Sequence, residues 1–295
     1  MKKLLMLLLA LLCLLNSALA EEPVIHYIAG ESELPEGWAE KDLLRVTFVD
    51  VQRSDAILLQ CGGENMLVDG GLGLHYLRLF RVLDDAGVTE LKYLLNTHCD
   101  GDHSQGLKCL MNSDLYGTGI LLCPNKKNYD DPDDDHEKMV RAADRHGWEY
   151  QQIDHGEVFT LGGAQLTVIR CGENWGQNNR SAMARVEFGG RSILLAADVG
   201  LKAQQYFAAH ADAALLDCDL LKVPHHGLDS VNDVFVDAIS PEGVVITNMN
   251  VSEVSKDWQA YKPLYSGDGV VVLETDGSVW YAWQLPNWLD HEMGT

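Results

Sequence analysis

The chain has 295 residues, and its 44 acidic side chains outnumber its 22 basic ones, which gives a formal net charge of −22. An anionic surface repels phosphate backbones and anionic lipid headgroups, so long nucleic acid and membrane surfaces are disfavoured as partners. No cluster of Lys and Arg marks a local basic groove. A small-molecule substrate is the expected partner, and the composition leaves the oligomeric state open.

Residues 1–20 have the pattern of a secretory signal peptide. Lys2-Lys3 precedes an almost wholly apolar stretch, 4–15, and Ala18-Leu19-Ala20 forms an Ala-x-Ala cleavage site before Glu21. The apolar stretch is too short and wrongly flanked for a spanning helix, and no later apolar run approaches 18 residues. We therefore expect no membrane span and a secreted or extracytoplasmic mature protein. Loss of the two lysines would bring its net charge to −24.

The first half of the mature sequence predicts strands followed by helices. Its apolar runs and helical periodicities are typical of the following elements in chain order: a strand at 43–51, two strands at hairpin spacing at 56–61 and 65–71, a helix at 75–87, a buried strand at 91–97, a short helix at 104–112 with Ser104 as N-cap, a strand at 119–124 and a helix at 136–147.

The second half repeats a similar order. It predicts two or three strands within 148–170, a hairpin at 181–198, a helix at 201–211, a strand at 219–223, a helix at 231–239, a strand at 243–248 and a closing hairpin at 269–283. Such an order favours two packed sheets with helices outside them. No Pro/Gly/Ser-rich linker divides the chain, so we expect residues 21–295 to form one domain.

Six cysteines remain in the expected mature chain, at scattered spacings and several within apolar runs. An even number in an exported chain permits disulfides, but the apolar surroundings favour buried thiols. The six are Cys61, Cys99, Cys109, Cys123, Cys171 and Cys218.

Metal-binding side chains follow three predicted strands, each at the point where the strand ends. The stretch "THCDGDHSQGL" (97–107) contains two histidines and two aspartates, Asp198 follows "SILLA", and "PHHG" (224–227) follows "LLKV". Each stretch alone is more typical of a capped polar turn. Together they predict a metal site, because sheet edges hold side chains convergently and His and Asp supply donors at neutral pH.

These segments resemble the metallo-β-lactamase superfamily, and in particular its ComEC-type, competence-protein-like branch. "THCDGDHSQGL" is similar to the His-x-His-x-Asp-His motif, and "VTFVDVQRSDAILLQCGGENMLVDGG" resembles the opening strands of that branch. "NNRSAMARVEFGGRSILLAADVG" and "LLKVPHHGLDSV" are similar to its later motifs, so the resemblance extends over about 44–283. It implies an α/β fold, the four-layer αβ/βα metallo-β-lactamase sandwich, with a dinuclear metal site at one edge.

The resemblance also implies a ligand set for two divalent metal ions. The first ion would be bound by His98 and Asp100. The second would be bound by Asp102, His103 and His225, and Asp198 would bridge the two ions. Because His225 and His226 are adjacent, His226 remains an alternative ligand to His225.

The sequence departs from the family pattern in two ways. Asp100 stands where the family usually has its second histidine, and the separate downstream histidine of true β-lactamases has only His155 as a spare candidate, in a segment typical of a turn. Fewer imidazoles and more carboxylates shift the preference from Zn²⁺ toward harder ions such as Mn²⁺. Either Zn²⁺ or Mn²⁺ is therefore expected.

The implied activity is metal-dependent hydrolysis, with Asp102 handling a proton. Lys222 is a second catalytic candidate that would stabilise an oxyanion or a phosphate, unless it is a surface lysine. The branch resemblance favours a phosphodiester, and the charge favours a small one; β-lactams fit export but not the ligand set. The alternative is a non-catalytic or one-metal remnant that binds a ligand, a reading that Asp100 favours.

Overall fold

The computed structural model describes residues 23–124, 134–171 and 175–286. The signal peptide expected at residues 1–20 lies outside the described residues. No helix in the described part of the chain is both long and apolar enough to span a membrane.

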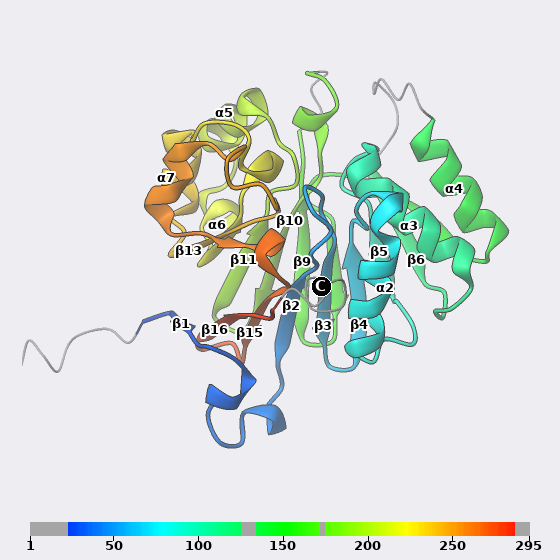
Figure 1. Ribbon diagram of the computed structural model, residues 1–295. Helices are drawn as coiled ribbons and strands as arrows, with labels where there is room; N and C mark the ends of the chain where they lie inside the picture. Colours follow the sequence, from blue (N-terminus) through cyan, green and yellow to red (C-terminus); the bar gives the residue numbers. More distant parts are fainter. Residues whose placement is uncertain (1–22, 125–133, 172–174, 287–295) are drawn as a thin grey trace, which may run out of the picture.

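Two mixed sheets form the centre of the molecule (Figure 1). The first has nine strands in the order β1-β16-β15-β2-β3-β4-β5-β6-β7. Its strands are β1 (Ile25–Tyr27), β2 (Leu44–Phe48), β3 (Ile57–Cys61), β4 (Glu64–Val68), β5 (Tyr93–Leu95), β6 (Ile120–Pro124), β7 (Glu149–Ile153), β15 (Val271–Thr275) and β16 (Trp280–Gln284).

The second sheet has seven strands in the order β14-β13-β12-β11-β10-β9-β8. Its strands are β8 (Val158–Leu161), β9 (Ala164–Ile169), β10 (Met183–Phe188), β11 (Arg191–Leu195), β12 (Leu220–Lys222), β13 (Gly243–Ile246) and β14 (Leu264–Tyr265). Three strands therefore occupy the stretch 148–170, for which two or three were predicted.

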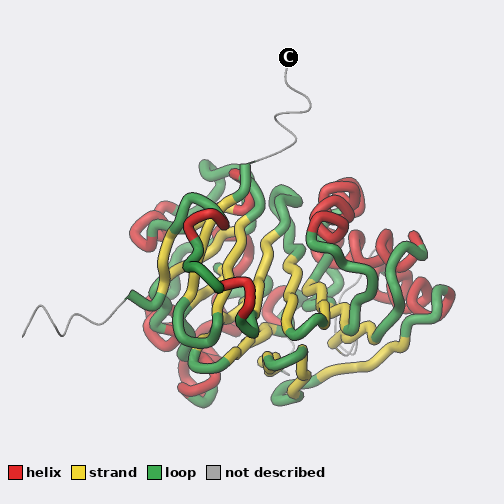
Figure 2. The backbone as a smooth tube through the Cα atoms, turned by 90° about the horizontal axis from the view of Figure 1, so that it is seen from below, coloured by secondary structure: helices red, strands yellow, loops and turns green. Residues whose placement is uncertain are grey.

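Helices cover the outer face of each sheet. On the nine-stranded sheet lie α2 (Tyr76–Asp85), α3 (Gly101–Ser113) and α4 (Asp135–Arg145); on the seven-stranded sheet lie α5 (Leu201–His210), α6 (Ala213–Leu216) and α7 (Asp233–Ile239). Seen from below, the strands fill the middle and the helices lie toward the outside (Figure 2). The described 3-10 turns include η3 (Gly73–His75), η4 (Asn178–Arg180), η5 (Pro224–Gly227) and η6 (Lys256–Tyr261).

Three apolar clusters hold these layers together. One joins the facing sides of the two sheets and includes Phe48, Leu59, Val186 and Leu195. A second lies between the nine-stranded sheet and its helices, and a third between the seven-stranded sheet and its helices. Burial of apolar surface at roughly 25 cal/mol per Å² makes these contacts the main driving force for the layered arrangement. The four-layer αβ/βα sandwich predicted from the sequence is confirmed.

The cysteines agree with the sequence-based expectation. No disulfide joins the six cysteines in the described part of the chain, and five of the six are buried.

One helix boundary was predicted wrongly. The sequence placed the start of a helix at Ser104, whereas α3 begins at Gly101, with Asp100 as its N-cap residue. Half of the His/Asp motif therefore lies in the first turn of a helix rather than in a loop.

Parallel strands bring the polar ends of both sheets to one edge. β4 pairs with β5, and β11, β12 and β13 pair in series, all in parallel, so the residues after each strand meet at the same end. The two sheets are joined there by a hydrogen bond from the Ala182 amide to the Thr97 carbonyl, 2.9 Å long. This edge carries the candidate site.

Candidate metal centre

Four side chains from three segments converge at this edge. Asp102 and His103 come from the first turn of α3, Asp198 follows β11, and His226 lies in η5; one donor atom of each lies within 4.8 Å of the others. The Asp198 Oδ2 atom is 3.3 Å from His103 Nε2 and 3.3 Å from His226 Nε2. The His226 Nε2 atom is 3.5 Å from Asp102 Oδ2.

Two glycines allow the helix to approach the end of β4. A Cβ at Gly70 would lie 2.4 Å from the backbone nitrogen of Leu107, and one at Gly106 would lie 1.8 Å from the carbonyl oxygen of Gly70. The Gly70 amide donates to the His103 carbonyl at 2.8 Å, which fixes the first turn of α3 against the strand end. Any larger residue at either position would push the metal motif away from the sheet.

Buried nitrogens without hydrogen-bond partners lie in and beside the cluster. The Nε2 atoms of His98, His103 and His226 are buried and have no hydrogen bond, and neither does the Asp198 Oδ1 atom. A buried polar atom left unpaired costs about 1–3 kcal/mol. Imidazole nitrogens and carboxylate oxygens are suitable donors for Zn²⁺ or Mn²⁺, so these residues fit a divalent metal ion.

The opposite nitrogen of His226 is held in place by a hydroxyl group. The Thr247 Oγ1 hydroxyl donates to Asp55 Oδ1 at 2.6 Å, and its oxygen lies 3.0 Å from His226 Nδ1. Since the hydroxyl proton is directed at the carboxylate, the oxygen accepts from the His226 Nδ1–H group. The neutral imidazole then carries its proton on Nδ1 and presents the Nε2 lone pair to the cluster.

The motif histidines are held in the same way around Asp69. His103 Nδ1 donates directly to Asp69 Oδ2 at 2.7 Å. The Thr97 hydroxyl donates to the same oxygen at 2.6 Å and lies 3.1 Å from His98 Nδ1, from which it accepts. Each of the three imidazoles is thus fixed in the tautomer that a metal ligand needs.

Charges in the site perturb the pKa values of its members. Burial alone would lower the pKa of His226, but the carboxylates of Asp198 and Asp55 outweigh it and raise that pKa to about 10. The pKa of His103 is likewise raised against burial, by Asp198 and Asp69. Burial opposes ionisation of Asp102, but contacts with the two histidines lower its pKa to about 2. The cluster therefore stabilises cations strongly, and protons compete with metal for the imidazoles.

Strained backbone accompanies the convergent side chains. Asp69, Ala197, His225 and His226 have φ values of 55°, 46°, 49° and 53°, in the left-handed region. Such a conformation costs a non-glycine residue about 1–3 kcal/mol and persists only where the surroundings enforce it. All four residues lie at strand ends beside the cluster.

A comparison with known families agrees with this geometry. A model described as "Metallo-beta-lactamase superfamily" matches residues 49–239. The chain belongs to this superfamily.

Two curated proteins are related to the chain at low identity. The chain is 25% identical over 273 residues to competence protein ComA of Neisseria gonorrhoeae, covering 90% of this chain and 36% of that protein. It is 27% identical over 233 residues to recombination protein 2 of Haemophilus influenzae, covering 77% of this chain and 26% of that protein. The chain thus spans about a third or less of the length of these relatives. The match to ComA confirms the competence-protein-like resemblance predicted from the sequence.

A solved structure supports the fold. The metallo-beta-lactamase fold protein YhfI from Bacillus subtilis superposes with a TM-score of 0.52 at 12% identity, over 75% of this chain and 95% of that one. The chain therefore has the hydrolase-type fold of the metallo-β-lactamase superfamily, with a His/Asp cluster suited to divalent metal.

The structure places His226, not His225, in the cluster of this superfamily member. The His225 side chain is partly exposed, and its Nδ1 atom lies 2.9 Å from Asp229 Oδ2. Its Nε2 atom is 3.4 Å from the Asn178 amide nitrogen, and its ring centre is 6.3 Å from that of His226. The sequence-based assignment of His225 thus differs from the geometry, because the left-handed backbone turns consecutive side chains apart.

The two residues expected on the first ion lie beside the four-residue cluster. The His98 ring centre is 4.2 Å from that of His103, and the His98 Nε2 atom is 3.3 Å from Asp100 Oδ2. Asp100 is partly exposed at the rim. The spare candidate His155 is exposed and accepts from the Arg170 amide at 3.3 Å, which agrees with its expected place in a turn.

Lys222 is not the surface lysine that was one of the two sequence-based alternatives. Its side chain is fully buried, whereas a surface lysine would be exposed. The ammonium forms an ion pair with Asp55 Oδ2, lies 3.6 Å from Asp198 Oδ1, and donates to the Ala197 carbonyl at 2.9 Å. It therefore faces the inner side of the site.

Sequence reasoning missed the residues that hold the histidines. These are Asp55, Asp69, Thr97 and Thr247. A signal was present for the two aspartates, because both lie within the segment similar to the family's opening strands, Asp55 just before the predicted strand 56–61 and Asp69 within the predicted strand 65–71. Thr97 lies at the end of the predicted strand 91–97, directly before the His/Asp motif, but its residue type gave no signal, and nothing in the sequence singled out Thr247.

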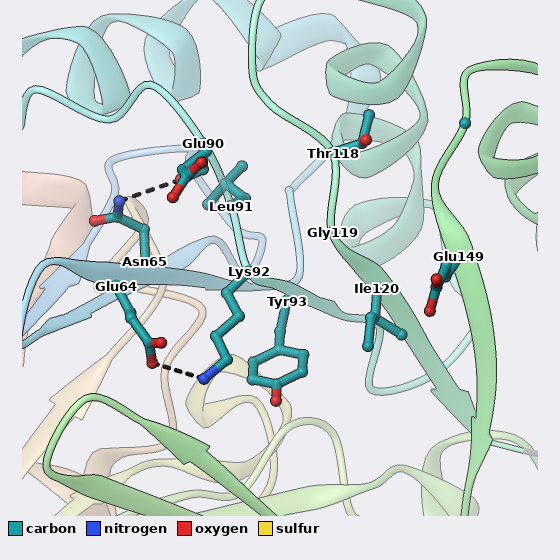
Figure 3. A pocket seen from close by; sticks show the side chains of 11 residues that line it. Glu64, Asn65, Glu90, Leu91, Lys92, Tyr93, Thr118, Gly119, Ile120 and Glu149 are labelled. Atoms are coloured by element: carbon teal, nitrogen blue, oxygen red, sulfur yellow. Dashed lines mark hydrogen bonds and ion pairs between the residues drawn. The ribbon is translucent and has the colours of Figure 1, made fainter.

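A hollow elsewhere on the molecule is distinct from the metal centre. It measures about 510 Å³ and lies at the opposite edge, where β4, β5, β6 and β7 begin. Figure 3 shows Glu64, Lys92, Tyr93 and Glu149 around it, with the Lys92 ammonium 2.7 Å from Glu64 Oε2. No histidine lines this hollow, and the described His/Asp cluster lies at the other edge.

Proposed function

We propose that the protein is an exported, metal-dependent hydrolase that cleaves a phosphodiester or a related small ester with metal-activated water. The observation that carries this proposal is the convergence of Asp102, His103, Asp198 and His226, with unpaired Nε2 atoms directed into the cluster. Membership of the superfamily supports hydrolysis as the reaction class.

The charge of the site supports two divalent ions, Zn²⁺ or Mn²⁺. Five carboxylates and one ammonium give it a formal charge of −4 when the imidazoles are neutral, and two ions would balance this charge; the charged residues are Asp55, Asp69, Asp100, Asp102, Asp198 and Lys222. His103, Asp102, Asp198 and His226 would hold one ion, while His98 and Asp100 would contribute to the other. When bound, such ions lower the pKa of water and stabilise charge on the attacked and leaving oxygens.

Asp102 is the residue proposed to handle the proton. Its side chain is 30% exposed, whereas the other three members of the cluster are buried. Its pKa of about 2 keeps it ionised at neutral pH, so it can orient the attacking water through a hydrogen bond and accept charge-assisted contacts. It is thus the member of the cluster that faces both solvent and metal.

The surroundings support a small substrate. A hollow of about 510 Å³ lies next to the loops that carry Asp55, Asp69 and Thr247, a size typical of ligand pockets. The lining residues are Gln52, Arg53, Leu72, Asn248, Met249, Asn250 and Glu253. Three of them carry side-chain amides, and Arg53 is already paired with Glu253 at 2.9 Å. An uncharged polar part of a substrate fits such a lining better than a phosphate chain.

The relatives' names support the phosphodiester class. They are a competence protein and a recombination protein, and the present chain matches only part of each. The net charge of −22 opposes long polyanions, so a short phosphodiester is favoured over extended nucleic acid.

A non-catalytic or one-metal protein that binds a ligand is the second candidate. The placement of His98 and Asp100 outside the four-residue cluster favours it, because that cluster alone supplies enough donors for a single ion. The two candidates differ in turnover and in the number of ions bound.

Metal analysis and a substrate panel test the proposal. The purified mature chain would be loaded with Zn²⁺ or Mn²⁺, its metal content measured, and its turnover followed on a chromogenic phosphodiester, a phosphomonoester and a β-lactam. Asp102→Asn should lower phosphodiester turnover by about 10²-fold or more. The matched control is Asp114→Asn, at the far end of α3, where the exposed Asp114 carboxylate lies 2.7 Å from Nδ1 of the partly exposed His146.

The outcomes separate the candidates. Phosphodiester turnover that depends on metal and on Asp102 supports the hydrolase. Tight binding of one ion without turnover of any substrate favours the one-metal ligand-binding protein, and absence of metal binding refutes the hydrolase and leaves the non-catalytic protein that binds a ligand. Export is tested separately, because the N-terminal residue of secreted protein should lie near Glu21.

A further inference from the structure

A lysine is buried beneath the metal centre. Lys222, the last residue of β12, has no exposed side-chain surface. Removing an ammonium from water costs several kcal/mol unless its partners compensate. Here the partners are Asp55 Oδ2, Asp198 Oδ1 at 3.6 Å, and the Ala197 carbonyl at 2.9 Å. The ammonium is thus placed between a ligand of the cluster and a carboxylate behind it.

A continuous chain of contacts leads from this lysine to His226. Asp55 pairs with Lys222 through Oδ2 and accepts from the Thr247 hydroxyl through Oδ1 at 2.6 Å. The Thr247 oxygen in turn accepts from His226 Nδ1 at 3.0 Å. The lysine therefore orients the carboxylate that orients the hydroxyl, and the hydroxyl determines which nitrogen of His226 faces the cluster.

The same lysine lies where a cation would otherwise be favoured. Asp55, Asp69 and His103 form a second group whose donor atoms lie within 4.8 Å of one another. The His103 Nδ1 atom of this group is already bonded to Asp69 at 2.7 Å, and Asp55 is paired with the ammonium. Asp55 thus has a cationic partner supplied by the protein itself, and Asp69 has a hydrogen-bond donor in His103.

We propose that Lys222 is a positioning residue for the metal centre: its ammonium serves as the fixed inner cation, and through Asp55 and Thr247 it holds His226 as an Nε2 ligand. This inference rests on the metal site of the proposed function and concerns affinity for the ion. It assigns Lys222 no contact with substrate.

Thr247 gives the sharpest test, because its hydroxyl can be removed without changing the size of the side chain. Thr247→Val deletes the nearer acceptor for His226 Nδ1–H, at 3.0 Å, and leaves only Asp55 Oδ1 at 3.4 Å, whereas Thr247→Ser retains the hydroxyl. Loss of a group that orients a ligand lowers metal affinity by about 10–100-fold. Titration calorimetry with Zn²⁺ and with Mn²⁺ alone should show this loss for Thr247→Val and an affinity near wild type for Thr247→Ser.

The lysine is tested together with its partner, because Lys222→Met alone would leave a buried, unpaired carboxylate and could unfold the protein. The double variant Lys222→Met/Asp55→Asn removes both charges and keeps similar shapes. It should remain folded by circular dichroism and bind Zn²⁺ about 10–100-fold more weakly. The control is Lys92→Met/Glu64→Gln, which removes an ion pair at the opposite edge and should leave the affinity unchanged.

Nuclear magnetic resonance of histidine nitrogens provides a readout that a merely structural lysine would not change. In the Zn²⁺-loaded wild type the His226 signal should be that of a ring protonated on Nδ1, and in the double variant and in Thr247→Val it should shift or broaden. Wild-type affinity and an unchanged His226 signal in both folded variants would overturn the inference. Absence of Zn²⁺ binding by the wild type would instead refute the proposed function.

Discussion

The assignment of the metal ligand within the His225–His226 doublet gives the most direct test of the site. Each histidine is replaced in turn by asparagine, because both positions have a left-handed backbone that asparagine tolerates better than alanine. The two variants therefore make the same chemical change at adjacent positions. Only His226 lies within the cluster, with its Nε2 atom 3.3 Å from Asp198 Oδ2.

The expected loss of affinity follows from sharing the binding energy among the ligands. Four-ligand zinc sites in small proteins bind with roughly 10–16 kcal/mol, or about 3 kcal/mol for each ligand. Because 1.4 kcal/mol corresponds to about tenfold, deletion of one ligand should weaken binding by roughly 100-fold. His226→Asn should show this loss, and His225→Asn, which removes a contact with Asp229, should change the affinity by less than about threefold.

Competition between the protein and a chromogenic Zn²⁺ chelator measures both affinities on one scale. Circular dichroism spectra check that each variant is folded. If His225→Asn lost the larger share of affinity, the arrangement of η5 described above would be wrong, and the sequence-based assignment of His225 would be restored.

Three further predictions concern the same site. Asp102→Asn should abolish turnover of a phosphodiester, a fall of about 10²-fold or more, while the far-UV circular dichroism spectrum stays that of the wild type. Asp100→His should move metal preference toward Zn²⁺, measured as the ratio of Zn²⁺ to Mn²⁺ affinities, since it exchanges an oxygen donor for a nitrogen donor. The metal-free protein should lose stability as the pH rises from about 6.5 to about 10, because the pKa values of His103 and His226 are higher in the folded than in the unfolded protein. Their protonation stabilises the fold fully below the pKa of the unfolded state, and this stabilisation is lost as the pH rises through the pKa of the folded state. The melting temperature should fall over this pH range without metal, and it should fall less with Zn²⁺, because Zn²⁺ binds the imidazoles in their neutral form. An equal fall with and without Zn²⁺ would contradict the assignment of these histidines as ligands.

Much of the site was predictable because its residues are local to strand ends. Asp102, His103 and Asp198 follow apolar runs that the sequence marks as buried strands, and parallel pairing brings such ends together. The four-layer order was predictable for the same reason, since alternating apolar runs and helical periodicities indicate which faces are buried. These inferences need only the spacing of apolar residues along the chain.

The doublet and the start of α3 were not predictable from spacing. Which of His225 and His226 faces the cluster depends on two successive positive φ angles, and these are imposed by packing around η5 rather than by residue type. The capping preference of Ser104 was outweighed by Asp100, whose backbone carbonyl accepts from the amides of both His103 and Ser104. Tertiary contacts at Gly70 and Gly106 then fix the earlier start.

The role of charge was also different from what composition suggests. A motif crowded with carboxylates implies mutual repulsion that only bound metal relieves. The structure places the Lys222 ammonium and two imidazoles of raised pKa among those carboxylates. Pairings between residues so far apart in sequence, such as Asp55 with Lys222, leave no local pattern, so the sequence could not reveal the compensation.

The compensation explains how the site can be held ready for an ion. The imidazoles of His98, His103 and His226 are fixed through Nδ1 by groups that are themselves hydrogen-bonded, so their orientation does not depend on a metal. Strained backbone at Ala197 and His226 adds a cost of about 1–3 kcal/mol at each residue, which the surrounding layers must supply. The unpaired Nε2 atoms of His103 and His226, which both lie 3.3 Å from Asp198 Oδ2 and are held there through Nδ1, are the physical argument that this edge is suited to bind metal.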